Sequence, residues 1–269
     1  MNNRFNIENP LLIHAICGGT KCDKVPLEKT GGYLYYEDRP IGRAFLEYCY
    51  SVIFGIHRFP GYENYYSLCG YECSWLVESG AISEEDIVSA CRELKDLYEF
   101  TRAHLGEREV TLYRTLNSAE IRSAKWVDEK IAFHTNIMSS YTQSPNMAYR
   151  GDIKIKRTVN TKDILMLDEI TAFPDKRYGM CEYRPIVGEH EVWVRNVDRY
   201  GRVFIDPDDI VKGKEIFLKE IDKKPPQRQT PAGDCSLMES YVSPYKPCEI
   251  SKFSRWLTKR NMKKIQRKL

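Results

Sequence analysis

The spacing of apolar residues changes near residue 106, and this change constrains the fold more than any other feature of the chain. Before that point, apolar positions recur every three or four residues, as they do on one face of an α-helix. Ile87, Cys91 and Leu94 follow this spacing, and Ser83 stands ahead of three acidic residues in the position of a helix N-cap. Later apolar residues occur in short alternating runs, which are typical of β-strands. The sequence therefore predicts an α+β protein.

Residue ranges can be assigned to the expected elements from this periodicity. We expect strands at 109–116, 152–159, 163–170, 190–197, 202–206 and 215–221. We expect helices at 40–55, 64–79, 83–106 and 118–134, the last of them embedded in the β-rich part. Residues 1–37 contain two Gly-Gly pairs and are expected to be irregular.

The chain divides into three expected regions, and its composition indicates a soluble protein. The regions are a mostly helical subdomain (1–105), a β-rich domain (106–222), and a linker followed by a basic segment (223–269). Hydrophobic residues make up 42% and charged residues 29% of the 269 positions, which is typical of a globular protein. No apolar run approaches the roughly 18 residues of a membrane span. We expect a cytoplasmic location, either in the cell that makes the protein or in a host.

Nine cysteines occur at irregular spacing, at positions 17, 22, 49, 69, 73, 91, 181, 235 and 248. An odd number without a regular pattern favours reduced, mostly buried thiols in a reducing compartment. Cys17 and Cys22, together with Cys69 and Cys73, form the alternative of a zinc site, although their spacings lie at the edge of the usual pattern. We expect no metal.

Positive charge is concentrated at the C-terminus. Residues 252–269 contain eight basic residues and no acidic one, which leaves 33 basic against 38 acidic residues in the rest of the chain. An amphipathic helix is one interpretation of this segment, because Phe253, Trp256 and Ile265 fall roughly on one side of it. The basic side could contact an anionic protein, contact nucleic-acid phosphates, or remain solvated while the apolar side packs.

Three short motifs in the β-rich part follow one another in an informative order. Arg114 stands in the expected strand "TLYRTL", and Ser139 begins a hydroxyl-rich stretch, "SSYTQSP", which we interpret as a turn. Glu189 and Glu191 then flank a histidine at the start of the strand "EVWV". Like charges two positions apart repel one another, so a site for a cation or a cationic transition state is one reason to place them there.

This order of motifs resembles the arginine–serine–glutamate class of ADP-ribosyltransferases, which includes cholera-toxin-like enzymes. The resemblance covers residues 109 to about 206, and the middle motif reads Ser139-Ser140-Tyr141 where the family has Ser-Thr-Ser. It implies a split β-sandwich core with NAD+ as the substrate. It also implies that side chains from the three motifs converge on one cleft that binds the dinucleotide.

The resemblance implies a role for each motif residue. Glu191 would stabilise the oxocarbenium-like ribose that forms when the nicotinamide–ribose bond breaks, and Ser139 would hydrogen-bond and orient it. Arg114 would bind the diphosphate with its forked guanidinium. Glu189 would receive the acceptor, because a carboxylate can bind and deprotonate a guanidinium.

An aromatic residue is expected to stack on the nicotinamide ring. Tyr149 is our candidate, and Tyr141 is the rival. Each motif residue also has a structural interpretation: Arg114 as an ion-pair partner, Glu191 as a charge at a strand edge, and a tyrosine as part of the core.

The sequence therefore predicts a mono-ADP-ribosyltransferase that modifies a macromolecule, most simply a protein arginine, in the manner of a bacterial toxin or effector. An alternative acceptor is a base of RNA or DNA, as in a toxin–antitoxin or phage-defence toxin. The helical subdomain offers a place for an inhibitor, an antitoxin or a chaperone. A non-enzymatic protein that binds nucleic acid or acts as a scaffold is the alternative of another class.

Overall fold

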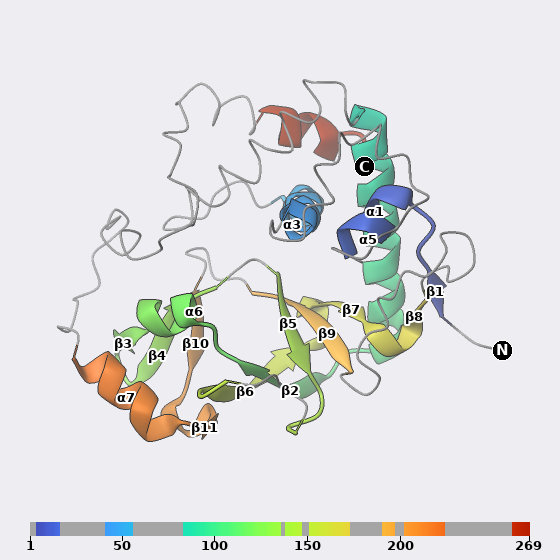
Figure 1. Cartoon of the computed structure of the whole chain (residues 1–269). Coiled ribbons are helices and arrows are strands. Elements are labelled where there is room, and N and C mark those ends of the chain that lie inside the picture. The colour runs from blue at the N-terminus through green and yellow to red at the C-terminus, as the bar shows by residue number, and fades with distance from the viewer. Residues whose placement is uncertain are drawn as a thin grey trace.

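The computed structural model describes residues 4–16, 41–55, 83–135, 138–146, 151–172, 190–196, 202–223 and 260–269. Within these ranges the protein is an α+β structure of antiparallel sheets and helices. Figure 1 shows α1, α3 and α5 grouped on one side of the molecule, and the two larger sheets with α6 and α7 on the other.

The largest sheet has six strands in the order β11-β6-β2-β5-β9-β7, and every described pairing in it is antiparallel. These strands are β2 (Glu109–Thr115), β5 (Met138–Thr142), β6 (Lys154–Asn160), β7 (Ile164–Leu167), β9 (Glu191–Arg195) and β11 (Ile210–Lys212). Strands β2, β5 and β9 are neighbours in the sheet, although they lie far apart in the sequence. The sheet therefore brings the three sequence motifs onto adjacent strands.

A smaller sheet has the order β10-β4-β3, and two short strands form a parallel pair elsewhere. The smaller sheet consists of β3 (Lys125–Val127), β4 (Lys130–His134) and β10 (Arg202–Ile205), and the pair consists of β1 (Phe5–Asn6) and β8 (Thr171–Ala172). A core cluster that includes Phe133, Ile155 and Phe217 packs this sheet against the β6 side of the larger one.

Helix α5 (Glu84–Leu105) is the longest helix, and its ends form as the sequence predicts. The Ser83 hydroxyl accepts a hydrogen bond from the Asp86 N–H, and the Asp86 carboxylate accepts one from the Ser83 N–H, so the two residues form a capping box. Gly106 follows the last turn with a φ of 65°. The other described helices are α1 (Pro10–Ile16), α3 (Ile41–Ile53), α6 (Ser118–Ser123), α7 (Lys214–Asp222) and a C-terminal helix over residues 260–266. The 3₁₀ turns are η2 (Thr161–Asp163), η3 (Asp168–Ile170) and η4 (Pro207–Asp209).

One core cluster joins the helices to the larger sheet. Buried residues of α1, α3 and α5, such as Leu12, Phe45 and Leu94, belong to the same cluster as Met138 on β5 and Trp193 on β9. A separate cluster that includes Tyr141 and Val192 lies on the opposite face of these strands. The central strands are thus largely covered on both faces, although Ser140, in the middle of β5, is exposed.

Two expected elements differ in the structure. The range 118–134 was expected to be a single helix, but α6 ends at Ser123 and a β3–β4 hairpin follows, with Asp128 in the turn at a φ of 55°. The range 215–221 was expected to be a strand, but it lies in α7, where Phe217 and Ile221 are buried four residues apart. In both cases a short apolar pattern fits both the helical period of 3.6 and the strand period of two, and packing against a neighbouring element decides which one forms.

Two stretches expected to be irregular are instead regular. Residues 10–16 form α1, which begins after Asn9; the Asn9 side chain accepts hydrogen bonds from the Leu11 and Leu12 N–H groups. The hydroxyl-rich stretch expected to be a turn begins inside β5, because its backbone pairs with both β2 and β9.

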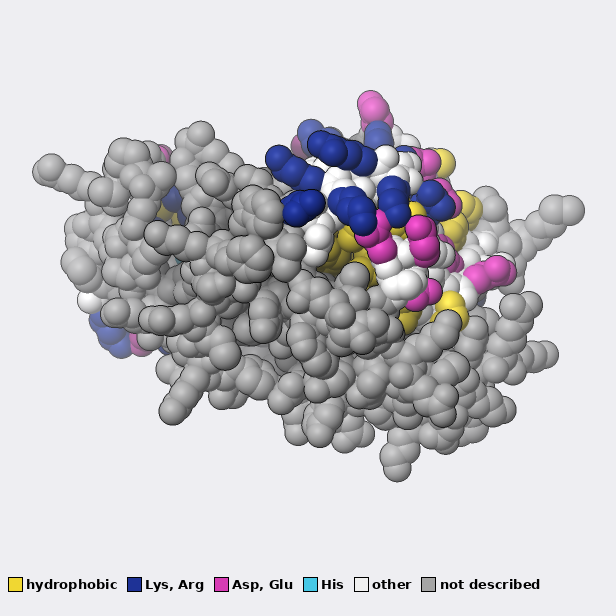
Figure 2. All heavy atoms as spheres, turned by 90° about the horizontal axis from the view of Figure 1, so that it is seen from above, with side chains coloured by type: hydrophobic (Ala, Val, Ile, Leu, Met, Phe, Trp, Pro, Cys, Tyr) yellow, Lys and Arg dark blue, Asp and Glu magenta, His cyan; other side chains and the backbone are white. Residues whose placement is uncertain are grey.

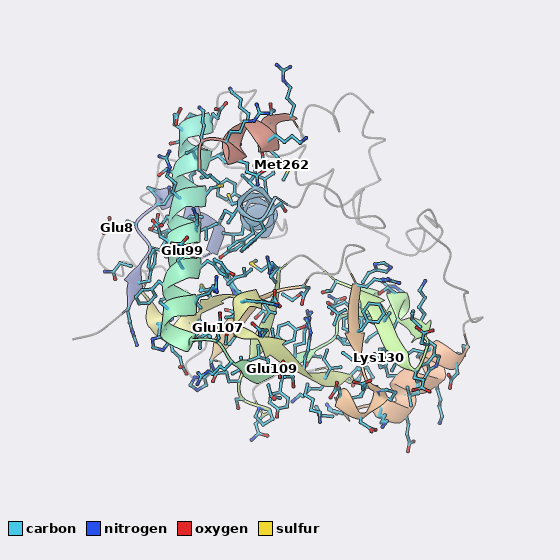
Figure 3. The ribbon with its side chains drawn as sticks, turned by 180° about the vertical axis from the view of Figure 1, so that it is seen from behind. Glu8, Glu99, Glu107, Glu109, Lys130 and Met262 are labelled. Carbon is cyan, nitrogen blue, oxygen red and sulfur yellow. The ribbon has the colours of Figure 1, made fainter. Side chains whose placement is uncertain are left out.

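The described part of the basic C-terminal segment packs onto the helical side of the protein. Met262 and Ile265 are buried in the core cluster that also contains residues of α1, α3 and α5. Figure 3 shows Met262 on the C-terminal helix beside α5. Lys264 and Lys268 form ion pairs with Glu84, in the first turn of α5. Figure 2 shows the basic side chains of this region gathered beside acidic ones. The apolar side of the described C-terminal helix therefore packs on the core, as one of the three interpretations of this segment expected.

Other expectations can be compared with the described ranges only in part. Cys49 and Cys91 are buried, and the other cysteines lie outside the described residues. The expected helix 64–79 also lies outside them, as does nearly all of the expected linker 223–234. Among the described residues, no helix is long and apolar enough to cross a membrane.

Candidate active site on the central strands

The larger sheet places Arg114, Ser139 and Glu191 on the neighbouring strands β2, β5 and β9. In the antiparallel pairing, Thr142 lies opposite Glu191 and Tyr113 lies opposite Thr142. The backbone positions of the three motifs are therefore close together. Whether their side chains meet depends on which face of the sheet each one occupies.

The register divides these side chains between the two faces. Residues directly opposite one another in an antiparallel pair project from the same face, and successive residues alternate. Ser140 lies opposite Trp193, so it shares a face with Glu191, which is two residues before Trp193. Ser139 lies opposite Val194 and therefore projects from the other face. We call these the Glu191 face and the Tyr141 face.

On the Glu191 face, two donors hold one carboxylate oxygen. The Ser140 hydroxyl donates a hydrogen bond of 2.6 Å to Glu191 Oε1, and the Trp193 indole Nε1 donates one of 3.0 Å to the same oxygen. Ser140 is exposed and Glu191 is partly buried, while Trp193 anchors the pair in the core. Hydrogen bonds of this kind fix the direction of the carboxylate.

On the Tyr141 face, Arg114 belongs to a buried network. Its guanidinium forms an ion pair of 2.8 Å with Glu120 and lies 5.3 Å from the centre of the Tyr141 ring. Thr135 donates a hydrogen bond of 2.5 Å to Glu120 and lies 3.0 Å from the hydroxyl of Ser139. The Arg114 side chain is only 11% exposed. This network joins α6 to β2 and β5.

The geometry corrects two roles expected from the resemblance. Ser140, and not Ser139, hydrogen-bonds Glu191, because the period of two along β5 turns Ser139 to the opposite face. Arg114 does not converge with Glu191, because its side chain lies on the Tyr141 face and its charge is balanced by Glu120. The expected meeting of Arg114, Ser139 and Glu191 in one cleft is therefore wrong for the side chains, although it holds for the strands.

The two expected aromatic residues and the second glutamate have different outcomes. Tyr141 is only 2% exposed, and its hydroxyl lies 3.4 Å from the Asn196 side-chain oxygen, so it belongs to the core and not to a stacking surface. Tyr149 and Glu189 lie outside the described residues. Their expected roles therefore stay predictions.

Acidic side chains border Glu191 across the β7–β9 ladder. Leu167, the last residue of β7, pairs with Val192, so Asp168, the first residue of η3, follows at the end of the ladder where β9 begins with Glu191. Glu169, also in η3, contacts His190, whose backbone adopts a φ of 48°. Burial, followed by the charges of Glu191 and Glu169, raises the pKa of Asp168 to about 6.

Sequence reasoning missed three of the residues at this site. Ser140 could have been found from strand alternation, because it lies two residues before Thr142, the partner of Glu191, and so projects from the same face. Trp193 could have been found in the same way, two positions after Glu191. Asp168 carries no signal in the sequence, because only the pairing of β7 with β9 brings it to Glu191.

Comparison with known proteins does not assign this site. No known family, curated protein or solved structure matches the chain. Among the described residues, no group of three or more histidine, cysteine or acidic side chains is arranged to hold a metal ion.

Proposed function

We propose that the protein is a mono-ADP-ribosyltransferase that uses NAD+ and places Glu191 against the ribose. The observation that supports this proposal is the hydrogen bond from Ser140 to Glu191 at the start of β9, reinforced by the Trp193 indole. An ionised, oriented carboxylate on one face of a sheet suits a reaction in which positive charge develops on a sugar.

The chemistry follows from where the charge changes. As the bond between nicotinamide and ribose C1′ breaks, its electron pair leaves with nicotinamide and the ribose becomes cationic. A carboxylate that faces this cation stabilises the transition state more than the ground state. The acceptor then bonds to C1′. A donor pair that keeps Glu191 aimed avoids reorganisation at that moment.

Arg114 takes a different role in this proposal from the one that the resemblance implies. Its ion pair with Glu120 and its contact with Tyr141 make it a positioning residue that fixes β2 and β5 beside one another. The proposal therefore rests on Glu191, Ser140 and Trp193, and it assigns no described residue to the diphosphate.

Release of nicotinamide from NAD+ tests this function. We expect the full chain to release nicotinamide, and we expect Glu191→Gln to lower the rate by about a hundredfold, because it removes the charge that faces the ribose cation. Glu109→Gln is a matched control, since Glu109 also begins a strand of the same sheet but is exposed at its far end. Equal rates in Glu191→Gln and Glu109→Gln would contradict the proposal.

A nucleic-acid acceptor is a second candidate, favoured by the surface of the C-terminal helix. Arg260, Lys263 and Arg267 are exposed there, and Lys264 and Lys268 on the same helix form ion pairs with acidic residues of α5. Exposed cations of this kind attract phosphates. With NAD+ labelled in its adenylate, replacing the three exposed residues by serine should lower label in the nucleic-acid fraction of a lysate. Label confined to protein, unchanged by the replacement, would favour a protein acceptor.

A further inference from the structure

The acceptor must lose a proton during transfer, and the two donors on Glu191 do not supply a group that takes it. Ser140 and Trp193 both direct their hydrogen atoms at Glu191 Oε1. Glu189, to which the resemblance gives this step, lies outside the described residues. Among the described residues, a base must lie close to Glu191 and be distinct from it. Such a group must be ionised near neutral pH, able to hold a proton, and free of a strong internal partner.

Asp168 is positioned for this task by the strand register. The pairing of Leu167 with Val192 brings Asp168 to the position across from Glu191, at the end of the β7–β9 ladder. Leu167 and Val192 both belong to the core of the Tyr141 face, so alternation directs the next residues to the Glu191 face. The charge of Glu191 acts on Asp168, which agrees with their proximity.

The surroundings of Asp168 leave its carboxylate available. In the described part of the chain, the Asp168 side chain forms no hydrogen bond or ion pair, whereas the neighbouring Glu169 is held by His190. Asp168 is partly buried, and the charged groups that act on it are Glu191, Glu169, Arg4 and His190. Burial raises the pKa of Asp168 most, and the carboxylates, which outweigh the cations, raise it further, to about 6.

We propose that Asp168 is the base that accepts the acceptor's proton, a role that rests on the proposed function. The bond between nicotinamide and C1′ breaks with its electron pair on nicotinamide, a lone pair of the acceptor forms the new bond to C1′, and the acceptor's proton passes to the Asp168 carboxylate. Asp168 therefore serves transfer, while Glu191 serves cleavage. At pH 7 the carboxylate is mostly ionised, yet it holds a proton better than an ordinary aspartate.

The test separates cleavage from transfer in the same protein. Agmatine, a small guanidine, serves as the acceptor probe, and both nicotinamide release from NAD+ alone and ADP-ribosyl-agmatine are measured. We expect Asp168→Asn to keep nicotinamide release within about threefold and to lose about a hundredfold in transfer. In the wild type, the ratio of transfer to cleavage should rise as the pH increases through about 6, and in Asp168→Asn it should stay flat. Asp168→Glu should recover part of the transfer.

Controls keep the two proposals distinguishable. Glu109→Gln changes an exposed carboxylate at the far end of the same sheet and should leave the ratio unchanged. Absence of nicotinamide release in the wild type would overturn the proposed function and this role together. Release without dependence of transfer on Asp168 would overturn this role alone. A folded Asp168→Asn protein, judged by circular dichroism, that loses cleavage and transfer equally would also overturn it.

Discussion

Ser139 and Ser140 are adjacent in the sequence, yet they contact different parts of the protein. Ser139 is buried beside Thr135 on the Tyr141 face, whereas Ser140 is exposed and hydrogen-bonds Glu191. A one-residue step along a strand reverses the face, so the two hydroxyls cannot exchange roles. The proposed function therefore depends on Ser140, whereas stability depends on its neighbour Ser139.

Alanine at each serine should separate these roles. We expect Ser140→Ala to lower nicotinamide release by about tenfold with little change in stability, because Glu191 loses the hydrogen bond from Ser140. We expect Ser139→Ala to lower the free energy of unfolding by about 1–2 kcal/mol, because a buried hydroxyl contact is lost. Steady-state release and urea denaturation measure the two effects. The reverse assignment of effects would show that Ser139 serves Glu191.

The pKa of Asp168 also predicts how stability depends on pH. The folded protein binds this proton more tightly than the unfolded chain, whose aspartate has a pKa of 3.8, so stability declines as the pH rises from about 4 to about 6. Asparagine binds no proton in this pH range, so the Asp168→Asn variant does not lose this stability as the pH rises. The variant should be more stable than the wild type at pH 8 by about 1 kcal/mol, a figure reduced for a half-exposed group.

Measurement of the same two proteins at low pH checks this prediction. At about pH 3, where Asp168 is mostly protonated in both states, the difference in unfolding free energy between Asp168→Asn and the wild type should nearly vanish. Urea denaturation at several pH values measures it. A difference that stays constant from about pH 3 to about pH 8 would mean that proton binding by Asp168 does not cause it.

At the scale of elements, the network of Arg114 ties α6 to the central strands. Glu120 on α6 is 3% exposed and bonds both Arg114 on β2 and Thr135 after β4. A buried ion pair contributes little beyond a well-packed apolar pair, but removal of one partner leaves an uncompensated charge. The network therefore holds α6 beside β2 and the end of β4.

Single and double replacements should show this asymmetry. We expect Glu120→Leu to lower the free energy of unfolding by about 3–5 kcal/mol, because Arg114 is left buried without a counter-charge. The pair Glu120→Leu with Arg114→Met should recover much of this loss. Chemical denaturation of the four proteins in the cycle measures the coupling. Additive losses would contradict a direct ion-pair coupling. If the double variant folds and still releases nicotinamide, Arg114 has no direct part in catalysis.

At the scale of the whole molecule, residues from both ends of the chain share one core. Leu12 near the N-terminus and Ile265 near the C-terminus belong to the cluster that also contains Trp193 of the central sheet. The C-terminal helix is therefore part of the folded body in its described residues. Its apolar side contributes to stability, and its exposed basic side remains accessible to a partner.

Substitution on the two sides of this helix should have unequal effects. Ile265 is 3% exposed, so Ile265→Ala should lower the free energy of unfolding by about 2–4 kcal/mol. Lys263, exposed on the same helix, is the matched control, and Lys263→Ala should change it by less than about 0.5 kcal/mol. Thermal and urea denaturation measure both. Similar small effects would mean that the helix does not pack on the core in solution.

The sequence determined those elements whose signals are local. The capping box of Ser83 and Asp86 and the apolar spacing after it defined α5, and the alternating runs defined β2, β6 and β9. The same reasoning placed Glu191 at the start of a strand. These features depend on backbone capping and on side-chain period, which neighbouring residues alone specify.

Only the tertiary structure decided the face of each side chain and the partners that it meets. The pairing of β5 with β9 selected Ser140 over Ser139, and the pairing of β7 with β9 brought Asp168 to Glu191. Packing likewise made 215–221 a helix, by burying Phe217 and Ile221. Register and burial depend on residues far apart in the chain, so no local pattern specifies them.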